Sequence, residues 1–246
     1  MRGACIAALG LAGAVLSAGC SDDDGTVNLG PSVTGSGTIV TVTPDVSGFS
    51  DVSLAYAFEA TITRADSFHV EVRVDDNILE YLTVEKQGDV CMIYLESGVN
   101  YRETTQEANI VVPDLERMSL SGASTAAVSG FDSEHTMRAS LSGASVTSGT
   151  MNTGDFILTL SGASRATLTG SCRDLLAVVS GASNLDFSDF TCEGADLEVS
   201  GASRVTVHPE GMLDCIVSGA SVVYYYGDPV LGSIEISGES FVIAVD

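Results

Sequence analysis

Apolar and polar residues alternate along much of the chain, on both sides of a recurring four-residue motif. The motif reads SGAS, begins first at Ser121, and ends as the variant SGES at Ser237. Alternation with a period of two predicts a strand that buries one face. We therefore predict one strand before and one strand after each motif. The residues directly before the motifs, all aliphatic and all predicted to point inward, are Leu120, Leu141, Leu160, Val179, Val199, Val217 and Ile236.

The motif returns at a nearly constant interval. Its copies start 21, 19, 19, 20, 18 and 19 residues apart, which is typical of a repeat architecture. Two-residue Asn-Gly or Asp-Gly turns are absent between the strands, so a stack of antiparallel hairpins is disfavoured. The pattern predicts an all-β fold, a single-stranded parallel β-helix or β-solenoid. Its rungs of about 19 residues would stack at about the 4.8 Å spacing of paired strands.

The motif itself is predicted to form the corner of each coil. Its glycines would relieve crowding or adopt a positive φ, and its serine hydroxyls would bond along the stack. Counting parity through the motif places the Gly and the second Ser inward, and the first Ser and the Ala outward. We therefore expect a buried, mutually hydrogen-bonded column of second serines, namely Ser124, Ser145, Ser164, Ser183, Ser203, Ser221 and Ser240.

The stretch 36–113 is less periodic than the repeat region 114–246. We interpret it as the irregular amino-terminal half of the same solenoid, with a separate small β-domain as the alternative. Its predicted strands are Thr38–Val42, Phe58–Ile62, His69–Val74, Leu79–Val84, Val90–Leu95 and Asn109–Val112.

Composition supports a folded protein and narrows its partners. A chain of 246 residues with 45% apolar content can bury a core in one or two domains. The formal net charge of −23 is spread along the chain without a basic cluster. Phosphate binding needs Lys and Arg gathered on one surface, so we expect no nucleic-acid partner.

The amino terminus predicts export. After Arg2, the apolar run Ala4–Ala18 is too short to span a bilayer, so 1–19 is interpreted as a secretory signal peptide. Its end, LSAGC, resembles the lipobox of bacterial lipoproteins, which implies that Cys20 is lipidated and anchors the chain to a membrane. Ser17 stands where that pattern has an aliphatic residue, so ordinary cleavage is the alternative.

These features predict a location. A lipidated protein would lie at the outer membrane or cell surface, and an unlipidated one would be periplasmic or secreted. Residues 20–35 are polar and acidic, and are predicted to form a flexible linker.

Several segments together resemble a known family. They are GSG from Gly35, VSGF at Val46–Phe49, DDNILEYL at Asp75–Leu82, and the row of SGAS corners. Over about 35–245 the chain resembles the head GIN domain family of secreted bacterial proteins, described as auto-transporter adhesins. The resemblance implies a right-handed, pectin-lyase-like parallel β-helix without a known catalytic centre, and a role in adhesion. Asp246 directly follows the last rung and leaves no membrane-barrel segment, so anchoring is expected from Cys20.

Catalytic chemistry finds little support. A serine nucleophile elbow needs G-x-S-x-G, but the residue two places after the final Ser of the motif is never Gly. Repetition also favours structural serines. None of His69, His135 and His208 stands at a metal-binding helix spacing, so no catalytic residue, metal site or cofactor is predicted.

Two groups of residues are candidates for ligand binding. Arg165, Asn184 and Arg204 directly follow the motif on successive rungs, and Asp186 lies on the same face. A strip that binds polysaccharide is one interpretation, and ordinary cross-strand pairing of Arg with Asp is the other, preferred one. The tyrosines 224–226 are expected to cap the open carboxy-terminal edge, with Tyr224 and Tyr226 as secondary binding candidates.

Register also predicts a disulfide. Cys172 and Cys192 each stand eight residues before a motif, so they occupy equivalent positions on adjacent rungs. Stacked positions about 4.8 Å apart lie inside the Cα separation of roughly 4.4 to 6.8 Å that a disulfide tolerates. An exported protein meets an oxidising compartment. Two buried thiols are the alternative, and Cys91 and Cys215 are expected to be buried and free.

The function expected from these features is non-enzymatic. A secreted or lipid-anchored β-solenoid would present flat faces for adhesion or protein contact, to a cell-surface protein or glycan. A polysaccharide-binding or polysaccharide-active β-helix is the alternative. Binding of ice or a crystal surface would require Ser and Thr columns that face outward together.

Overall fold

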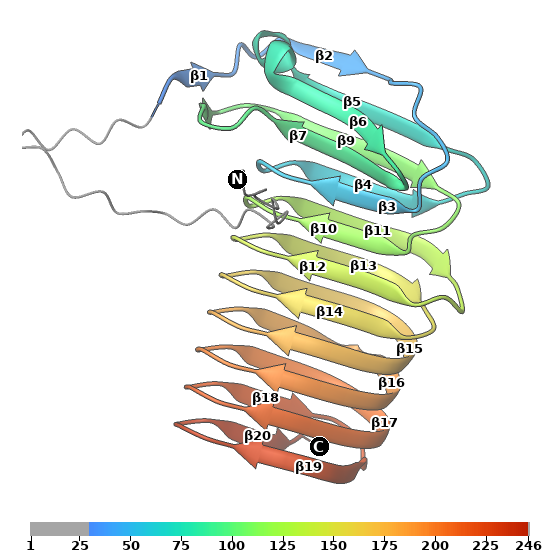
Figure 1. Cartoon of the computed structure of the whole chain (residues 1–246), viewed down its shortest axis with the longest axis vertical. Coiled ribbons are helices and arrows are strands. Elements are labelled where there is room, and N and C mark those ends of the chain that lie inside the picture. The colour runs from blue at the N-terminus through green and yellow to red at the C-terminus, as the bar shows by residue number, and fades with distance from the viewer. Residues whose placement is uncertain (1–29, 246) are drawn as a thin grey trace, which may run out of the picture.

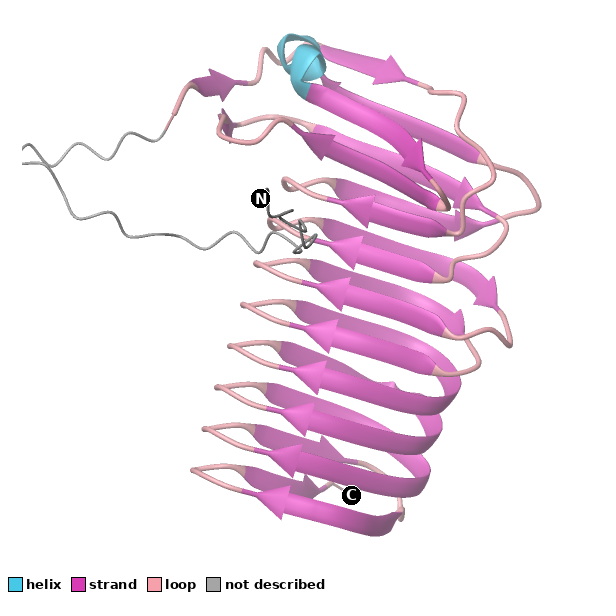
Figure 2. Ribbon diagram, viewed as in Figure 1, coloured by secondary structure: helices cyan, strands magenta, loops and turns pink. Residues whose placement is uncertain are grey.

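The protein is a stack of coils built almost entirely from strands. The computed structural model describes residues 30–245, which run from the amino-terminal strands at the top of Figure 1 to β19 and β20 at the bottom. The predicted all-β solenoid is confirmed, with one short 3-10 helix, η1 (Asp76–Tyr81), coloured cyan in Figure 2. The strands of the amino-terminal part are β1 (Ser32–Thr34), β2 (Ile39–Val42), β3 (Asp51–Leu54), β4 (Glu59–Arg64), β5 (His69–Asp75), β6 (Leu82–Gln87), β7 (Val90–Leu95), β8 (Asn100–Arg102) and β9 (Gln106–Val112).

Each rung of the repeat region has one strand before its corner and one after it, as the alternation predicted. The strands before the corners pair in parallel with one another, and those after the corners form the second face of the coil. In the later rungs the strand continues around the opposite bend into the next coil. The strands of this part are β10 (Arg117–Leu120), β11 (Thr125–Asp132), β12 (Met137–Leu141), β13 (Val146–Asn152), β14 (Phe156–Leu160), β15 (Arg165–Val179), β16 (Asn184–Val199), β17 (Arg204–Val217), β18 (Val222–Tyr225), β19 (Val230–Ile236) and β20 (Phe241–Ala244).

The predicted inward positions form the core. Leu141, Leu160 and Val179 are fully buried and follow one another in register. The last rung differs, because Ile236 is 49% exposed. Within residues 30–245, β19 and β20 each pair on one side only, so nothing described covers the inward face of that rung.

The corners confirm two expectations and correct a third. All seven motif glycines have a positive φ, such as +77° at Gly181. The second serines are buried, but the glycines are exposed, so the parity count through the motif was wrong at that position. A turn with a left-handed residue does not alternate its side chains as a strand does.

Among the described residues, the buried serines bond to one another only in the last rungs, where Ser203 N donates to Ser221 Oγ and Ser221 N to Ser240 Oγ, each at 3.3 Å. Four of them donate to the carbonyl of the first serine in their own motif, as Ser145 Oγ does to Ser142 O at 2.8 Å. This bond closes these four corners locally, which is the common short-range choice of a serine hydroxyl. Most bonds between the rungs at the corners join backbone groups, such as Ala182 N donating to Gly162 O at 2.7 Å.

The amino-terminal strands continue both faces, but not in chain order. Strand β3 pairs in parallel with both β7 and β10, and β4 pairs with both β9 and β11. The coil made by β3 and β4 therefore lies between two coils that come later in the sequence. Strand pairing therefore joins the stretch 36–113 to the repeat region 114–246, because β3 pairs with β10 and β4 with β11. The outer strands β2, β5 and β6 pair antiparallel and cover this end.

Several sequence predictions concern residues that precede residue 30. The signal peptide 1–19, Cys20 and most of the linker 20–35 lie outside the described residues. In the part of the chain that the structure describes, no helix is long and apolar enough to span a membrane.

Candidate contact surface

The structure brings five of the six proposed binding residues onto one outward face, formed by the strands that follow the corners. Arg165 pairs in register with Asn184, and Asn184 with Arg204. Asp186 lies two residues along from Asn184, and Tyr224 continues its column two rungs further on. We name this set of five residues the arginine–tyrosine surface.

The arginines of this surface do not form the cross-strand ion pairs that the sequence favoured. The Asp186 carboxylate accepts hydrogen bonds from the backbone N and hydroxyl of Ser188, at 3.3 and 2.8 Å. The guanidinium carbon of Arg204 lies 5.5 Å from the centre of the Tyr224 ring, a cation–π geometry. Among the described residues, neither Arg165 nor Arg204 lies within ion-pair distance of a carboxylate.

Tyr226 lies beside this surface but contacts other groups. Its ring centre is 5.9 Å from that of His208, whose Nδ1 lies 3.1 Å from the backbone oxygen of Ser188. The expected capping role is wrong, because β18 pairs with β17 on one side and β20 on the other. The SGES corner at Ser237 adds a further rung, so the tyrosines belong to the penultimate one.

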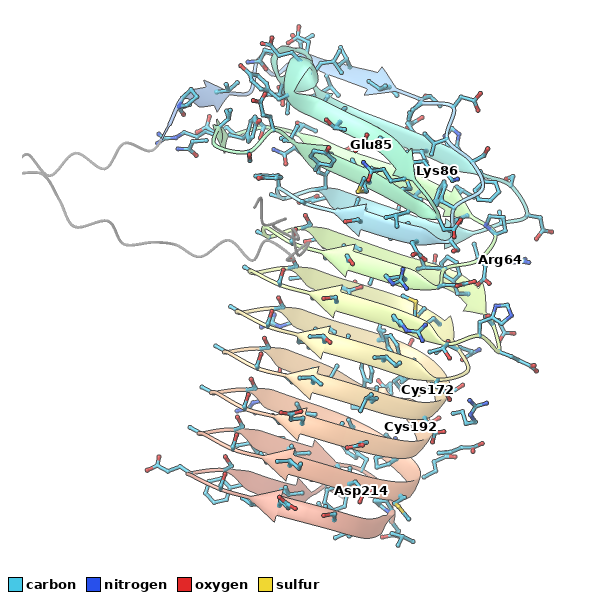
Figure 3. The ribbon with its side chains drawn as sticks, in the orientation of Figure 1. Arg64, Glu85, Lys86, Cys172, Cys192 and Asp214 are labelled. Atoms are coloured by element: carbon cyan, nitrogen blue, oxygen red, sulfur yellow. The ribbon has the colours of Figure 1, made fainter. Side chains whose placement is uncertain are left out.

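The predicted disulfide partners are in register but not bonded. Cys172 pairs directly with Cys192, and both are buried, free thiols on neighbouring strands (Figure 3). A hydrogen bond between the two side chains is the main cause that raises the pKa of Cys172, with burial second. The bond therefore stays a prediction for an oxidising compartment.

The other two cysteines are buried and free, as expected. Burial raises the pKa of Cys91 to about 11 and that of Cys215 to about 11. Both therefore remain neutral thiols at physiological pH, the form that does not act as a nucleophile.

Sequence reasoning missed a second surface, on the strands that precede the corners. Here four aspartates, Asp155, Asp174, Asp196 and Asp214, line a depression of about 430 Å³. Its other lining residues include the apolar side chains of Leu176 and Met212, which are 43% and 51% exposed. Gly194 contributes no side chain, which leaves the space open.

A signal for this second surface was present in the sequence. Asp196 and Asp214 each stand four residues before a motif and pair in register. The same column rule that identified the arginine row on the other face would have identified them.

Comparisons with known proteins identify a family and structures that resemble this chain. Residues 48–229 match a family described as "Putative auto-transporter adhesin, head GIN domain". A putative adhesin from Bacteroides fragilis has a similar structure, with 14% identity, a TM-score of 0.78, and coverage of 87% of this chain and 100% of that chain. A putative lipid binding protein from Parabacteroides distasonis has 16% identity and a TM-score of 0.74, over 87% of this chain and 100% of that chain.

A putative adhesin from Parabacteroides merdae is also similar, with 14% identity, a TM-score of 0.68, and coverage of 88% of this chain and 100% of that chain. At these identities the likeness to solved structures concerns the fold. No curated protein matches the chain. Because the family model covers well over half of the sequence, the chain belongs to the head GIN domain family.

Proposed function

We propose that this protein is a non-enzymatic, surface-displayed β-solenoid that binds a partner through the arginine–tyrosine surface. The family description supports a role in adhesion. The fold supports contact, because stacked strands form a rigid surface that loses little entropy when a partner binds. The observation that carries the proposal is that Arg165 and Arg204 are exposed and have no ion-pair partner within residues 30–245, on a chain of net charge −23.

The chemistry of this surface selects a partner that presents carboxylates. The planar guanidinium group of arginine matches a carboxylate with two parallel hydrogen bonds. Arg165 and Arg204 stand two rungs apart, or about 10 Å at the usual strand spacing. Tyrosine and arginine are also the residue types that contribute most at protein interfaces.

An acidic segment of a cell-surface protein is the partner we favour. An acidic glycan is the second candidate, since Tyr224 offers an aromatic ring beside the polar side chains of Asn184 and Asp186. The two candidates share the carboxylate and differ in the rest of the molecule.

Binding of the purified chain to isolated cell envelopes and to an array of acidic and neutral glycans tests the proposal. The double variant Arg165→Gln, Arg204→Gln should lose about tenfold or more in binding. Arg138→Gln, at an exposed arginine on the other face, is the matched control and should bind as the wild type does.

Each outcome of this experiment has a meaning. Loss of binding after the envelopes are treated with protease would assign a protein partner. Selective binding to acidic glycans would assign the second candidate. Equal binding by the double variant and the wild type would reject the arginine–tyrosine surface.

We also propose that the protein is exported and anchored through a lipid on Cys20. The support is the resemblance of LSAGC to a lipobox, and multiple acyl chains give stable membrane attachment where one chain does not. Metabolic labelling with a clickable fatty acid should mark the wild type and not Cys20→Ala. Equal labelling of both chains would rule out this anchor.

A further inference from the structure

The stacking of two rungs brings together metal-ligating side chains that are far apart in the sequence. Asp114 and Glu116 precede β10, and His135 precedes β12 on the next coil. One ligand atom of each of the three residues lies within 4.8 Å of the other two. Arg117 pairs with Arg138, which is 21 residues later, so Asp114 and His135 occupy equivalent positions on adjacent rungs. No motif in the sequence marks this cluster.

Two of the three side chains are held in place by neighbouring groups. His135 Nδ1 lies 3.0 Å from Asp114 Oδ2, while Asp114 Oδ1 accepts a hydrogen bond from Leu115 N at 2.9 Å. The backbone oxygen of His135 accepts from Thr153 Oγ1 at 2.7 Å and from Gly154 N at 3.0 Å. The next rung therefore fixes the loop that carries the imidazole.

The local charge favours a cation. In the described part of the chain, neither Asp114 nor Glu116 forms an ion pair with Lys or Arg, and Arg117 pairs with Asp51 instead. The charge of Glu134 also acts on His135. The cluster itself combines two carboxylates with a single imidazole.

We propose that Asp114, Glu116 and His135 bind a divalent transition metal of the zinc class. An imidazole nitrogen with two carboxylate oxygens is a donor set that suits Zn²⁺, whereas Ca²⁺ and Mg²⁺ take oxygen donors. Three protein ligands leave one position of a tetrahedral ion open for water or for a group from a partner. The site lies away from the arginine–tyrosine surface and does not depend on the function proposed for it.

Calorimetric titration of the EDTA-treated, purified full chain with ZnCl₂ at pH 7.5 tests the proposal. The wild type should show one saturable site, and His135→Ala and Asp114→Asn should bind at least about tenfold more weakly. His69→Ala, at an exposed histidine on β5, is the matched control and should bind as the wild type does. CaCl₂ should give no comparable binding.

The variants also need a measurement of fold. Unchanged thermal midpoints without metal would show that any loss of binding concerns the site. The proposal would be overturned if zinc showed no saturable binding or if His135→Ala bound zinc as tightly as the wild type. It would also be overturned if only Cys172→Ser lost binding, because the free thiols would then be the ligands.

Discussion

The repeat region and the amino-terminal region extend the same two faces but turn their corners differently. Leu54 pairs with Leu120, so the segment 55–58 occupies the place of SGAS in its own coil. Tyr56 and Ala57 have positive φ values of +67° and +61°. In most corners of the repeat, only the glycine has a positive φ. Phe58 is fully buried in the place of the second serine. The sheets therefore do not require the motif.

What the motif permits is close stacking of corner upon corner. A Cβ added to Gly181 would collide with the backbone oxygen of Gly162, and the same holds between the other glycines of the later rungs. The amino-terminal region instead closes its end with antiparallel strands. One region is built to be extended, and the other to end the stack.

The largest expected effect separates crowding from backbone strain. Gly181 and Gly37 both have φ of +77°, but a Cβ at Gly37 meets nothing within 4 Å. Gly181→Ala should lower the free energy of unfolding by about 3 to 5 kcal/mol, and Gly37→Ala by about 1 kcal/mol. Chemical denaturation of both variants measures the difference. Equal losses would mean that the repeat corners are not crowded.

A disulfide between two rungs of the repeat region has the next largest expected effect. Oxidation should join Cys172 to Cys192 and stabilise the repeat region by up to about 3 kcal/mol, as expected for a closed loop of this length. Alkylation of the unfolded, unreduced chain followed by mass spectrometry should then leave both residues unmodified. Cys91 and Cys215 are the internal controls and should both be labelled. Labelling at Cys172 and Cys192 would show that they stay reduced.

A buried carboxylate accepts hydrogen bonds from the backbone of two segments in the amino-terminal region. Asp75 is 1% exposed and accepts hydrogen bonds from Gly37 N at 2.6 Å and Thr105 N at 2.7 Å. Asp75→Ala leaves two backbone donors without this partner and should cost about 2 kcal/mol.

The loss should be confined to one region. Hydrogen exchange should speed up in β2 and β5 but not in β14 to β18. Asp76→Ala, which removes an exposed bond to Ser36, is the neighbouring control and should change little. Faster exchange throughout the stack would show that the two regions unfold as one unit.

The smallest effect concerns the left-handed alanines. Ala57→Gly should stabilise the protein by about 0.5 kcal/mol, because glycine removes the strain of a positive φ. Ala163, at the equivalent place in a repeat corner, is not among the positive-φ residues, so Ala163→Gly should destabilise by a similar amount. Thermal midpoints that move in the same direction would contradict this difference between the corners.

Periodicity allowed the repeat region to be predicted in detail. Inward columns, register and the burial of the second serines all follow from a fixed spacing of side chains. The exposure of Gly181 and the bonding of Ser145 did not follow, because a left-handed turn breaks the alternation. The capping role of Tyr224 failed because the SGES rung had to be counted as a further coil.

Features without periodicity could not be read from the chain. The position of β3 between β7 and β10 depends on contacts between segments with no shared motif. The Arg204–Tyr224 contact depends on how two long side chains turn above the sheet. The cluster of Asp114, Glu116 and His135 forms only through the register of two loops.

The displaced order of the first coils has a consequence for how the chain acquires its fold. The coil of β3 and β4 emerges first from the ribosome, yet both of its neighbours come from later segments, β7 to β9 and β10 to β11. One edge of each strand can pair once residue 112 is available, and the other edge stays unpaired until about residue 129. Each later rung needs only the one before it, and such nearest-neighbour growth can nucleate locally. During synthesis, the first coil would thus depend on later ones to be completed, while the rest of the stack can lengthen one rung at a time.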